Sequence, residues 1–483
     1  MIATPLSGRS AITWSTAEAM GRHALSLVFF LALTRLLTPA DIGLFAFALA
    51  VQTFAGVFVD RAVTETLVQR DCLRAEHLDA AFWLNLALAA ALGCVMALSA
   101  DLIAAAIGAP DIADLVRLLA PAPFIGALCN VQVALFQRRL NFRTPAKIWM
   151  TGQGVAGCIA VAMAIGGWGI WSLVANQIVE TSICAILFWL IGDWRPRFRF
   201  EWRAGRDLLR YWTGATGARL FFFAREGADR LILGIVLGPA ALGYYTVATR
   251  IVRMFVDLLA EGNGKAVLAI MSRMQTEQER LQAAFVHFLC FSTLLSFPAF
   301  CGLALVGPDF VTAFFGEHWK SSSEILPPLA IAGAGMMVLH IHSIFLRASG
   351  HSFVNLAMVS AVATLDVLLI SVTVPLGLST VAWALAGRGI LVLPICAAVT
   401  GGAGGRAARA YMPAVICTAV MILVILPLQE IARKHFDLIM ANLIVIVMGV
   451  LVYGAAVVLL GRSNLVELIR IWRAGTIAED LIK

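Results

Sequence analysis

The chain has 483 residues, of which 60% are hydrophobic and only 13% are charged, with a formal net charge of +7. So few polar residues cannot cover the surface of a water-soluble protein of this size, and the composition therefore indicates an integral membrane protein. The nine cysteines form no CxxC pair, which argues against structural disulfides and a zinc site. Neither a P-loop nor a dinucleotide-binding fingerprint is present, so no cofactor is expected.

Apolar runs of about 20 residues, the length that crosses a bilayer, predict an all-α polytopic membrane protein with about fourteen transmembrane helices. The N-terminus is polar and no cleavage pattern follows the first run, so the first span is expected to be retained rather than removed as a signal peptide. In chain order, the spans are predicted at residues 14–36, 42–66, 80–106, 113–137, 145–166, 168–192, 211–237, 242–268, 282–306, 324–346, 354–376, 379–400, 411–429 and 438–461.

Lysine and arginine are concentrated in the N-terminus, in the loops after even-numbered spans and in the C-terminal tail. These segments should be cytoplasmic, which places both termini inside the cell. The positive net charge is then largely a topology signal, and no nucleic-acid partner is expected. The basic and aromatic run from Arg195 to Trp212 follows span six, where such residues favour an anchor at anionic lipid over a nucleic-acid surface. An apolar stripe in the tail, beginning at Leu465, predicts an amphipathic helix on the inner membrane surface.

One turn occurs twice, as LTPADIG at residues 37–43 and as LGPAALG at residues 237–243. In the first copy Thr38 should cap a helix that starts at Pro39, with Asp41 completing a capping box; in the second, Gly238 and Pro239 should restart a helix. The copies lie six spans apart, and two weaker pairings follow in the same order. We therefore expect two parallel six-helix repeats around a central cavity. The predicted division is an N-terminal lobe at 1–206, a C-terminal lobe at 207–405, and two extra helices with the tail at 406–483.

Charged residues within the spans gather in spans one, two, seven and eight, although a charge at the bilayer centre costs roughly 3 kcal/mol. In span eight they follow one another at three- and four-residue steps from Arg250, which places them on one helix face. A basic, water-filled cleft between equivalent spans could bind a diphosphate through charge-assisted hydrogen bonds. The residues expected to bind cargo are Arg22, Arg61, Arg219, Arg225, Arg230, Arg250, Arg253 and Arg388. Those expected to support them or to couple ions are Glu18, Asp60, Glu65, Asp229, Asp257 and Glu261.

The same charges also fit a structural interpretation, in which they form internal salt bridges such as Arg253 with Asp257. Arg388, in span twelve between two glycines, could line the cavity or reach a backbone carbonyl. His340 and His342 are two residues apart on a helix and point in different directions, so no metal site is expected.

Seven segments, taken in order, resemble the landmarks of bacterial polysaccharide transporters. They are TRLLTPADIG, FVDRAVTETLVQR, AFWLNLALAA, RRLNFR, GWGIWSLV, DRLILGIVLGPAALGYYTVATR and FFGEHWKSSSEIL. These transporters are the Wzx-type lipid-linked oligosaccharide flippases of the multidrug/oligosaccharidyl-lipid/polysaccharide export (MOP) superfamily. The resemblance implies two six-helix lobes around a cavity, and transport of undecaprenyl-diphosphate-linked repeat units across the bacterial cytoplasmic (inner) membrane. Two residues depart from the family pattern: Arg61 replaces an apolar residue, and Ala269 replaces a proline that many members have.

Three functions are compatible with these observations. A flippase for exopolysaccharide, capsule or lipopolysaccharide O-antigen synthesis fits the arginine-rich spans best. A cation-coupled multidrug exporter of the same superfamily would need an acidic, aromatic cavity. A membrane glycan polymerase or ligase would need a sizeable external loop, whereas the longest one here has about 17 residues. The protein is therefore expected to be a flippase and not an enzyme, with the lipid-linked oligosaccharide and membrane lipid as partners and the polymerase of the same pathway as a further possible partner.

Overall fold

A computed structural model describes most of the chain, and almost all of the described residues are helical, with no strand among them. The side chains of residues 261–266, 269, 404, 408 and 460 are outside this description. The described residues are 21, 25–59, 64, 67–68, 73–139, 141–198, 201–202, 206, 227–400 and 404–460. The predicted all-α class is confirmed.

Within these residues, twelve helices are long and apolar enough to cross a membrane. They follow the predicted spans in order, with two differences. Span one is described only as a shorter apolar helix, Leu25–Leu36, because residues 14–20 and 22–24 are outside the described part. The described end of predicted span seven and the whole of predicted span eight belong to one continuous element, α10 (Ala228–Arg273), whose backbone leaves the helical conformation at Gly238.

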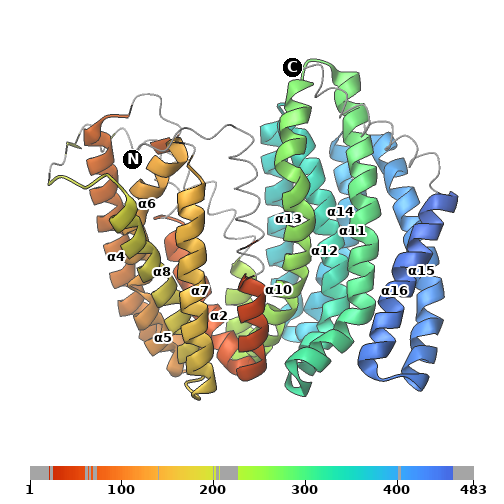
Figure 1. Ribbon diagram of the computed structural model, residues 1–483, viewed down its shortest axis with the longest axis horizontal. Helices are drawn as coiled ribbons and strands as arrows, with labels where there is room; N and C mark the ends of the chain where they lie inside the picture. The colour runs from red at the N-terminus through yellow and green to blue at the C-terminus, as the bar shows by residue number, and fades with distance from the viewer. Residues whose placement is uncertain are drawn as a thin grey trace. The chain divides into compact units, whose positions relative to one another are not determined.

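The chain divides into two compact units, each a set of helices (Figure 1). Unit 1 comprises Met1–Thr246 and Ile370–Pro375, and unit 2 comprises Val247–Leu369 and Leu376–Lys483. The helices of unit 1 are α2 (Pro39–Gly56), α4 (Ala75–Ile107), α5 (Asp111–Leu119), α6 (Ala122–Arg138), α7 (Arg143–Ile165), α8 (Trp171–Ile191) and the first part of α10. Unit 2 contains the rest of α10, α11 (Gln278–Phe315), η1 (Glu317–Trp319), α12 (Lys320–Ala348), most of α13 (Ser352–Thr373), the end of η2 (Val374–Leu376), α14 (Leu378–Val399), α15 (Gly404–His435) and α16 (Leu438–Leu460). The sequence predicts boundaries at residues 206 and 405 from the repeats, whereas the two compact units reflect which residues pack together. The predicted boundaries stay a prediction.

The first copy of the repeated turn begins α2 as predicted. The Thr38 hydroxyl accepts a hydrogen bond from the Asp41 amide at 3.2 Å, and the Asp41 carboxylate accepts one from the Thr38 amide at 3.1 Å. Pro39 occupies the first helical position, where a missing N–H costs nothing. The capping box is confirmed, and it could be predicted because all of its partners lie within four residues.

The second copy folds the chain back on itself. Gly238 has φ 81°, a value that residues with a side chain rarely adopt, and the helix resumes at Pro239. The Tyr245 hydroxyl donates to a carboxylate oxygen of Asp229 at 3.0 Å. Sixteen residues of straight helix would hold these two groups about 24 Å apart, so α10 is two helices that meet at a sharp bend.

The two copies of the turn also contact each other within unit 1. A Cβ atom at Gly43 would lie 1.7 Å from the carbonyl oxygen of Pro239, and one at Gly243 would lie 1.9 Å from that of Pro39. The glycine of each copy meets the proline carbonyl of the other, so the two contacts are equivalent: the two glycines, like the two prolines, are 200 positions apart in the sequence. The repeat read from the sequence is therefore also a symmetric contact in space.

Unit 2 includes the two C-terminal helices in its core. Ala407, Ala410 and Tyr411 of α15 are buried together with Phe285 of α11 and Val338 of α12. The Tyr453 hydroxyl of α16 donates to the Leu294 carbonyl at 2.6 Å. The helices that the sequence suggests as an appendage are thus packed into the same body as α11 and α12.

Candidate functional site

The charged residues of spans one, two and seven lie mostly beyond the described part of the chain. Asp229, Arg230, Arg250, Arg253 and Asp257 are described, and Glu261 is placed on α10 without its side chain. Those outside the described residues are Glu18, Arg22, Asp60, Arg61, Glu65, Arg219 and Arg225. The predicted cargo-binding set therefore stays a prediction.

Asp229 and Arg230 lie in the first turn of α10, ahead of the bend at Gly238. The Asp229 carboxylate accepts hydrogen bonds from the Arg230 amide at 2.8 Å and from the buried Tyr245 hydroxyl at 3.0 Å. Both bonds orient a carboxylate at the start of a helix, where negative charge is favoured by the helix dipole. Tyr245 was not predicted as a site residue because its contact depends on the fold-back at Gly238.

The charged residues of predicted span eight lie beyond the bend, on the part of α10 that belongs to unit 2. Arg250 is exposed, whereas Arg253 and Asp257 are half-buried. The helix is unbroken between these positions, so steps of three and four residues place the three side chains along one face. Two guanidinium groups on one face provide the donors that a diphosphate requires.

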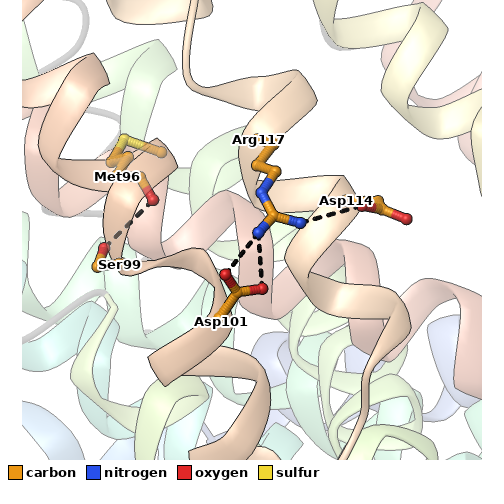
Figure 2. Close-up of polar contacts among 5 residues, drawn as sticks. All are labelled: Met96, Ser99, Asp101, Asp114 and Arg117. Atoms are coloured by element: carbon orange, nitrogen blue, oxygen red, sulfur yellow. Dashed lines mark hydrogen bonds and ion pairs between the residues drawn. The ribbon is translucent and has the colours of Figure 1, made fainter.

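Two of the isolated charges elsewhere in the spans form an ion pair in unit 1. Figure 2 shows the Arg117 guanidinium of α5 directed at Asp101 of α4, with both carboxylate oxygens 2.6 Å from Nη2, and a second contact to Asp114 at 3.3 Å. All three side chains are substantially exposed, with 43% exposure for Arg117 and 75% for Asp101. Their charges are therefore stabilised by the polar surroundings of the exposed side chains as well as by the ion pair itself.

A second pair is buried in unit 2. Arg388 of α14 lies 2.7 Å from Asp366 of α13, measured from Nε to Oδ1, and the two side chains are 1% and 13% exposed. The contact is an ion pair without hydrogen-bond alignment, and the Arg388 Nη1 atom has no hydrogen-bond partner among the described residues. This placement favours the structural interpretation of Arg388 over contact with cargo, and its predicted cargo role stays untested.

No role is predicted from the sequence for Arg138, the first residue of the RRLNFR segment. This side chain, at the end of α6, donates to the carbonyl oxygens of Leu67 and Val68 at 2.9 and 3.1 Å. It therefore fastens residues 67 and 68, which directly follow the predicted second span, to the end of α6. An arginine at the carbonyl end of a helix is a recognisable signal, but the sequence does not show which helix it reaches.

The segment after α8, residues 192–198, is fastened across the ends of α4 and α6. The Gln132 side chain donates to the Trp194 carbonyl at 2.7 Å, and the Trp83 indole donates to the Arg197 carbonyl at 2.9 Å. The buried Asp79 carboxylate accepts from the Arg197 amide at 3.0 Å, and Phe198 is left exposed. A fixed segment with exposed arginine and phenylalanine is compatible with the predicted lipid anchor, which stays a prediction.

His342 is part of a buried polar pair. Its Nδ1 donates to the Val338 carbonyl at 2.9 Å, so the neutral ring accepts at Nε2 from the Tyr411 hydroxyl at 3.2 Å. Among the described residues, no group of three His, Cys, Asp or Glu side chains is arranged to hold a metal ion. His342 therefore joins α12 to α15.

Long apolar helices and two related helix starts define a multi-pass helical membrane protein built from two repeats. A family model described as polysaccharide biosynthesis protein matches residues 32–324, more than half of the chain. The chain belongs to this family, and the resemblance read from the sequence is confirmed.

Individual relatives agree with this assignment. The teichuronic acid biosynthesis protein TuaB of Bacillus subtilis (strain 168) is 26% identical over 378 residues, covering 77% of this chain and 78% of the relative. The succinoglycan biosynthesis transport protein ExoT of Rhizobium meliloti (strain 1021) is 27% identical over 370 residues, covering 75% and 74%. Among solved structures, the lipid II flippase MurJ in an inward closed conformation superimposes with a TM-score of 0.76 at 14% identity, covering 94% of this chain and all of that one. At this identity, the superposition establishes the fold alone.

Proposed function

We propose that this protein is a flippase that moves undecaprenyl-diphosphate-linked oligosaccharide repeat units across the bacterial cytoplasmic membrane. The observation that carries the proposal is membership in the polysaccharide biosynthesis family together with the fold of a lipid-carrier flippase. A relative named as a succinoglycan transport protein supports transport rather than synthesis. The products served are exopolysaccharide, capsule or O-antigen.

Arg230, Arg250 and Arg253 on α10 are the described part of the proposed cargo site. A diphosphate carries several anionic oxygens, and an arginine binds two of them at once through its planar fork. Arg22, Arg61, Arg219 and Arg225 complete the proposed set. Half-buried carboxylates such as Asp257 keep neighbouring arginines oriented or couple ions to transport.

The multidrug exporters of the same superfamily share the fold, so the fold does not separate the two functions. Cationic drugs would be repelled by a face that carries Arg250 and Arg253, and this charge favours anionic cargo.

The helices around the longest predicted external loop also argue against a polymerase or ligase. Within the predicted external loop at residues 307–323, α11 continues to Phe315 and α12 begins at Lys320, which leaves little irregular chain for a catalytic loop.

We further infer the membrane topology of the chain, its division into lobes and its protein partner. Both termini lie in the cytoplasm, as the lysine and arginine bias predicts. The repeats form lobes at residues 1–206 and 207–405, followed by the two added helices and a membrane-surface tail. The polymerase of the same pathway is the proposed protein partner, because it consumes the translocated repeat unit.

Replacing Arg230, Arg250 or Arg253 singly by alanine tests the cargo site in cells that lack their own flippase. Loss of a charge-assisted contact should weaken binding roughly 10- to 150-fold, equivalent to about 1.5–3 kcal/mol. Surface polysaccharide should fall while the amount of membrane protein stays normal, and lysine should restore only part of the activity. Arg280→Ala is the matched control, because that side chain is exposed and its partner Glu277 lies on the same segment.

The structural interpretation makes a different prediction for the same variants. Arg253→Ala would then lower protein abundance by leaving Asp257 unbalanced, and the double variant Arg253→Ala/Asp257→Ala would restore it. Normal polysaccharide from all three alanine variants at normal abundance would exclude the diphosphate site.

A further inference from the structure

The contact between the two proline turns is closer than any side chain permits. Besides the Pro239 oxygen at 1.7 Å, a Cβ atom at Gly43 would lie 2.9 Å from the Gly243 amide nitrogen. On the other side, a Cβ atom at Gly243 would lie 1.9 Å from the Pro39 oxygen and 2.7 Å from its carbonyl carbon. The obstructing atoms are all backbone, so no change of rotamer could make room for a methyl group.

The surroundings of this contact are apolar and closely packed. Ile42 and Leu242, which precede the two glycines, are both buried, and so is Ala46 one turn further along α2. Phe47 packs against Gly234, where a Cβ atom would meet its ring at 2.4 Å. Small residues that let two membrane helices approach so closely provide van der Waals stabilisation without fixed polar partners. Such a contact can separate and re-form without breaking an ion pair.

The contact lies between the two repeats and at one end of their helices. Residues 39–43 begin the second span of the first repeat, and residues 239–243 begin the equivalent span of the second. The lysine and arginine bias assigns both turns to the outer side of the membrane. Cargo that leaves between these two helices on the outer side would have to part this contact.

We propose that Gly43 and Gly243 form a seam that closes the outer side of the transport pathway and that must separate for cargo to leave. The role in transport rests on the proposed function, whereas the seam itself is a property of the fold. Glycine is required at both positions only in the closed state, because the separated helices would leave room for a methyl group. Substitution by alanine should therefore shift the protein toward the open state.

The test measures access to a cysteine placed behind the seam. Ala46→Cys is introduced into a variant without the nine native cysteines, and its reaction with a membrane-impermeant maleimide is followed in intact cells. In the closed state this side chain is only 3% exposed. Gly43→Ala or Gly243→Ala should each accelerate labelling about 10-fold or more, which corresponds to a shift of roughly 1.4 kcal/mol toward the open state.

Gly154→Ala in α7 is the matched control. It makes the same substitution in a helix of the same unit, but a Cβ atom there meets nothing within 4 Å. Labelling should stay at the level of the unsubstituted protein. Equal labelling of the Gly43, Gly243 and Gly154 variants at normal abundance would overturn the proposal.

A second measurement avoids the glycine variants if they fail to accumulate. The Ala46→Cys protein is labelled in cells that synthesise the lipid-linked oligosaccharide and in cells that do not, and active transport should raise the rate. If these cells produce surface polysaccharide through this protein and the labelling rate is nevertheless unchanged, the proposed separation of the seam during transport is wrong. Failure of the proposed function gives a different result: alanine at Gly43 would increase labelling, while polysaccharide would not depend on the protein at all.

Discussion

The ion pairs Arg117–Asp101 in unit 1 and Arg388–Asp366 in unit 2 have nearly the same length, 2.6 and 2.7 Å, but very different surroundings. The first is exposed, and Arg117 has a second carboxylate close by. The second is almost completely enclosed, and part of its guanidinium has no hydrogen-bond partner among the described side chains and backbone. Distance alone therefore says little about what an ion pair contributes to a membrane protein.

The energetic difference follows from solvation. When one partner of an exposed pair is removed, water or lipid headgroups solvate the remaining charge, and the pair contributes about 0–1 kcal/mol. In a buried pair the remaining charge has no such replacement, and loss of one partner costs roughly 3–5 kcal/mol. Loss of one partner is therefore expected to change stability little for the exposed pair in unit 1 and strongly for the buried pair in unit 2.

The largest effect is expected for Arg388→Met, which removes the guanidinium from the buried pair with Asp366. Stability should fall by about 3–5 kcal/mol, and the amount of protein in the membrane should fall with it. The measurement is thermal unfolding of the detergent-solubilised protein, together with its abundance in membranes. The double variant Arg388→Met/Asp366→Asn should recover most of the loss, and a double variant no more stable than the single one would contradict this explanation.

An intermediate effect is expected for the buried neutral pair of unit 2. Tyr411→Phe removes the hydroxyl that donates to His342 and leaves the ring nitrogen unpaired, which should cost about 1–3 kcal/mol. Replacing both partners, as His342→Leu/Tyr411→Phe, should cost less than the sum of the single changes, because no polar group is then stranded. Additive losses, measured by the same thermal unfolding, would show that the two side chains act independently.

The smallest effect is expected for the exposed pair. Arg117→Ala should change stability by no more than about 1 kcal/mol, and that change should shrink further at high salt, which screens exposed charges. A loss as large as that of Arg388→Met would mean that lipid surrounds the Arg117 pair without access to water or headgroups. The comparison between the two units would then fail.

Local features of the fold could be predicted from the sequence, whereas contacts between distant segments could not. The Thr38 cap is one case, because Thr38, Pro39 and Asp41 carry all of its chemistry within four residues. The bend at Gly238 is another, since a glycine followed by proline marks a break on its own. The partner of Gly43 is 196 residues away at Pro239, and the repeat alone indicated a relation between the two turns.

In the candidate site, too, contacts between distant segments could not be predicted from the sequence. Asp366 and Arg388 were both recognisable as isolated charges within apolar spans, but nothing in the sequence indicated that α13 and α14 bring them together. Arg388 was accordingly grouped with the arginines of the cargo site. The face of α10 that carries Arg250 and Arg253 followed directly from helical spacing, because neighbouring turns of one helix need no knowledge of the fold.

The attachment of α15 to α11 has a consequence for the synthesis of the protein. Gln282 accepts from Arg406, the Leu305 carbonyl accepts from Gln429 at 3.1 Å, and Asp309 pairs with Arg433 at 2.5 Å. In each contact the partners are 124 residues apart, so the two helices run parallel and in register. At 5–20 residues per second, the ribosome needs roughly 6–25 s to supply the partner of each group on α11. During this interval the Asp309 carboxylate lacks its guanidinium, so α11 cannot complete its polar contacts until α15 has been synthesised.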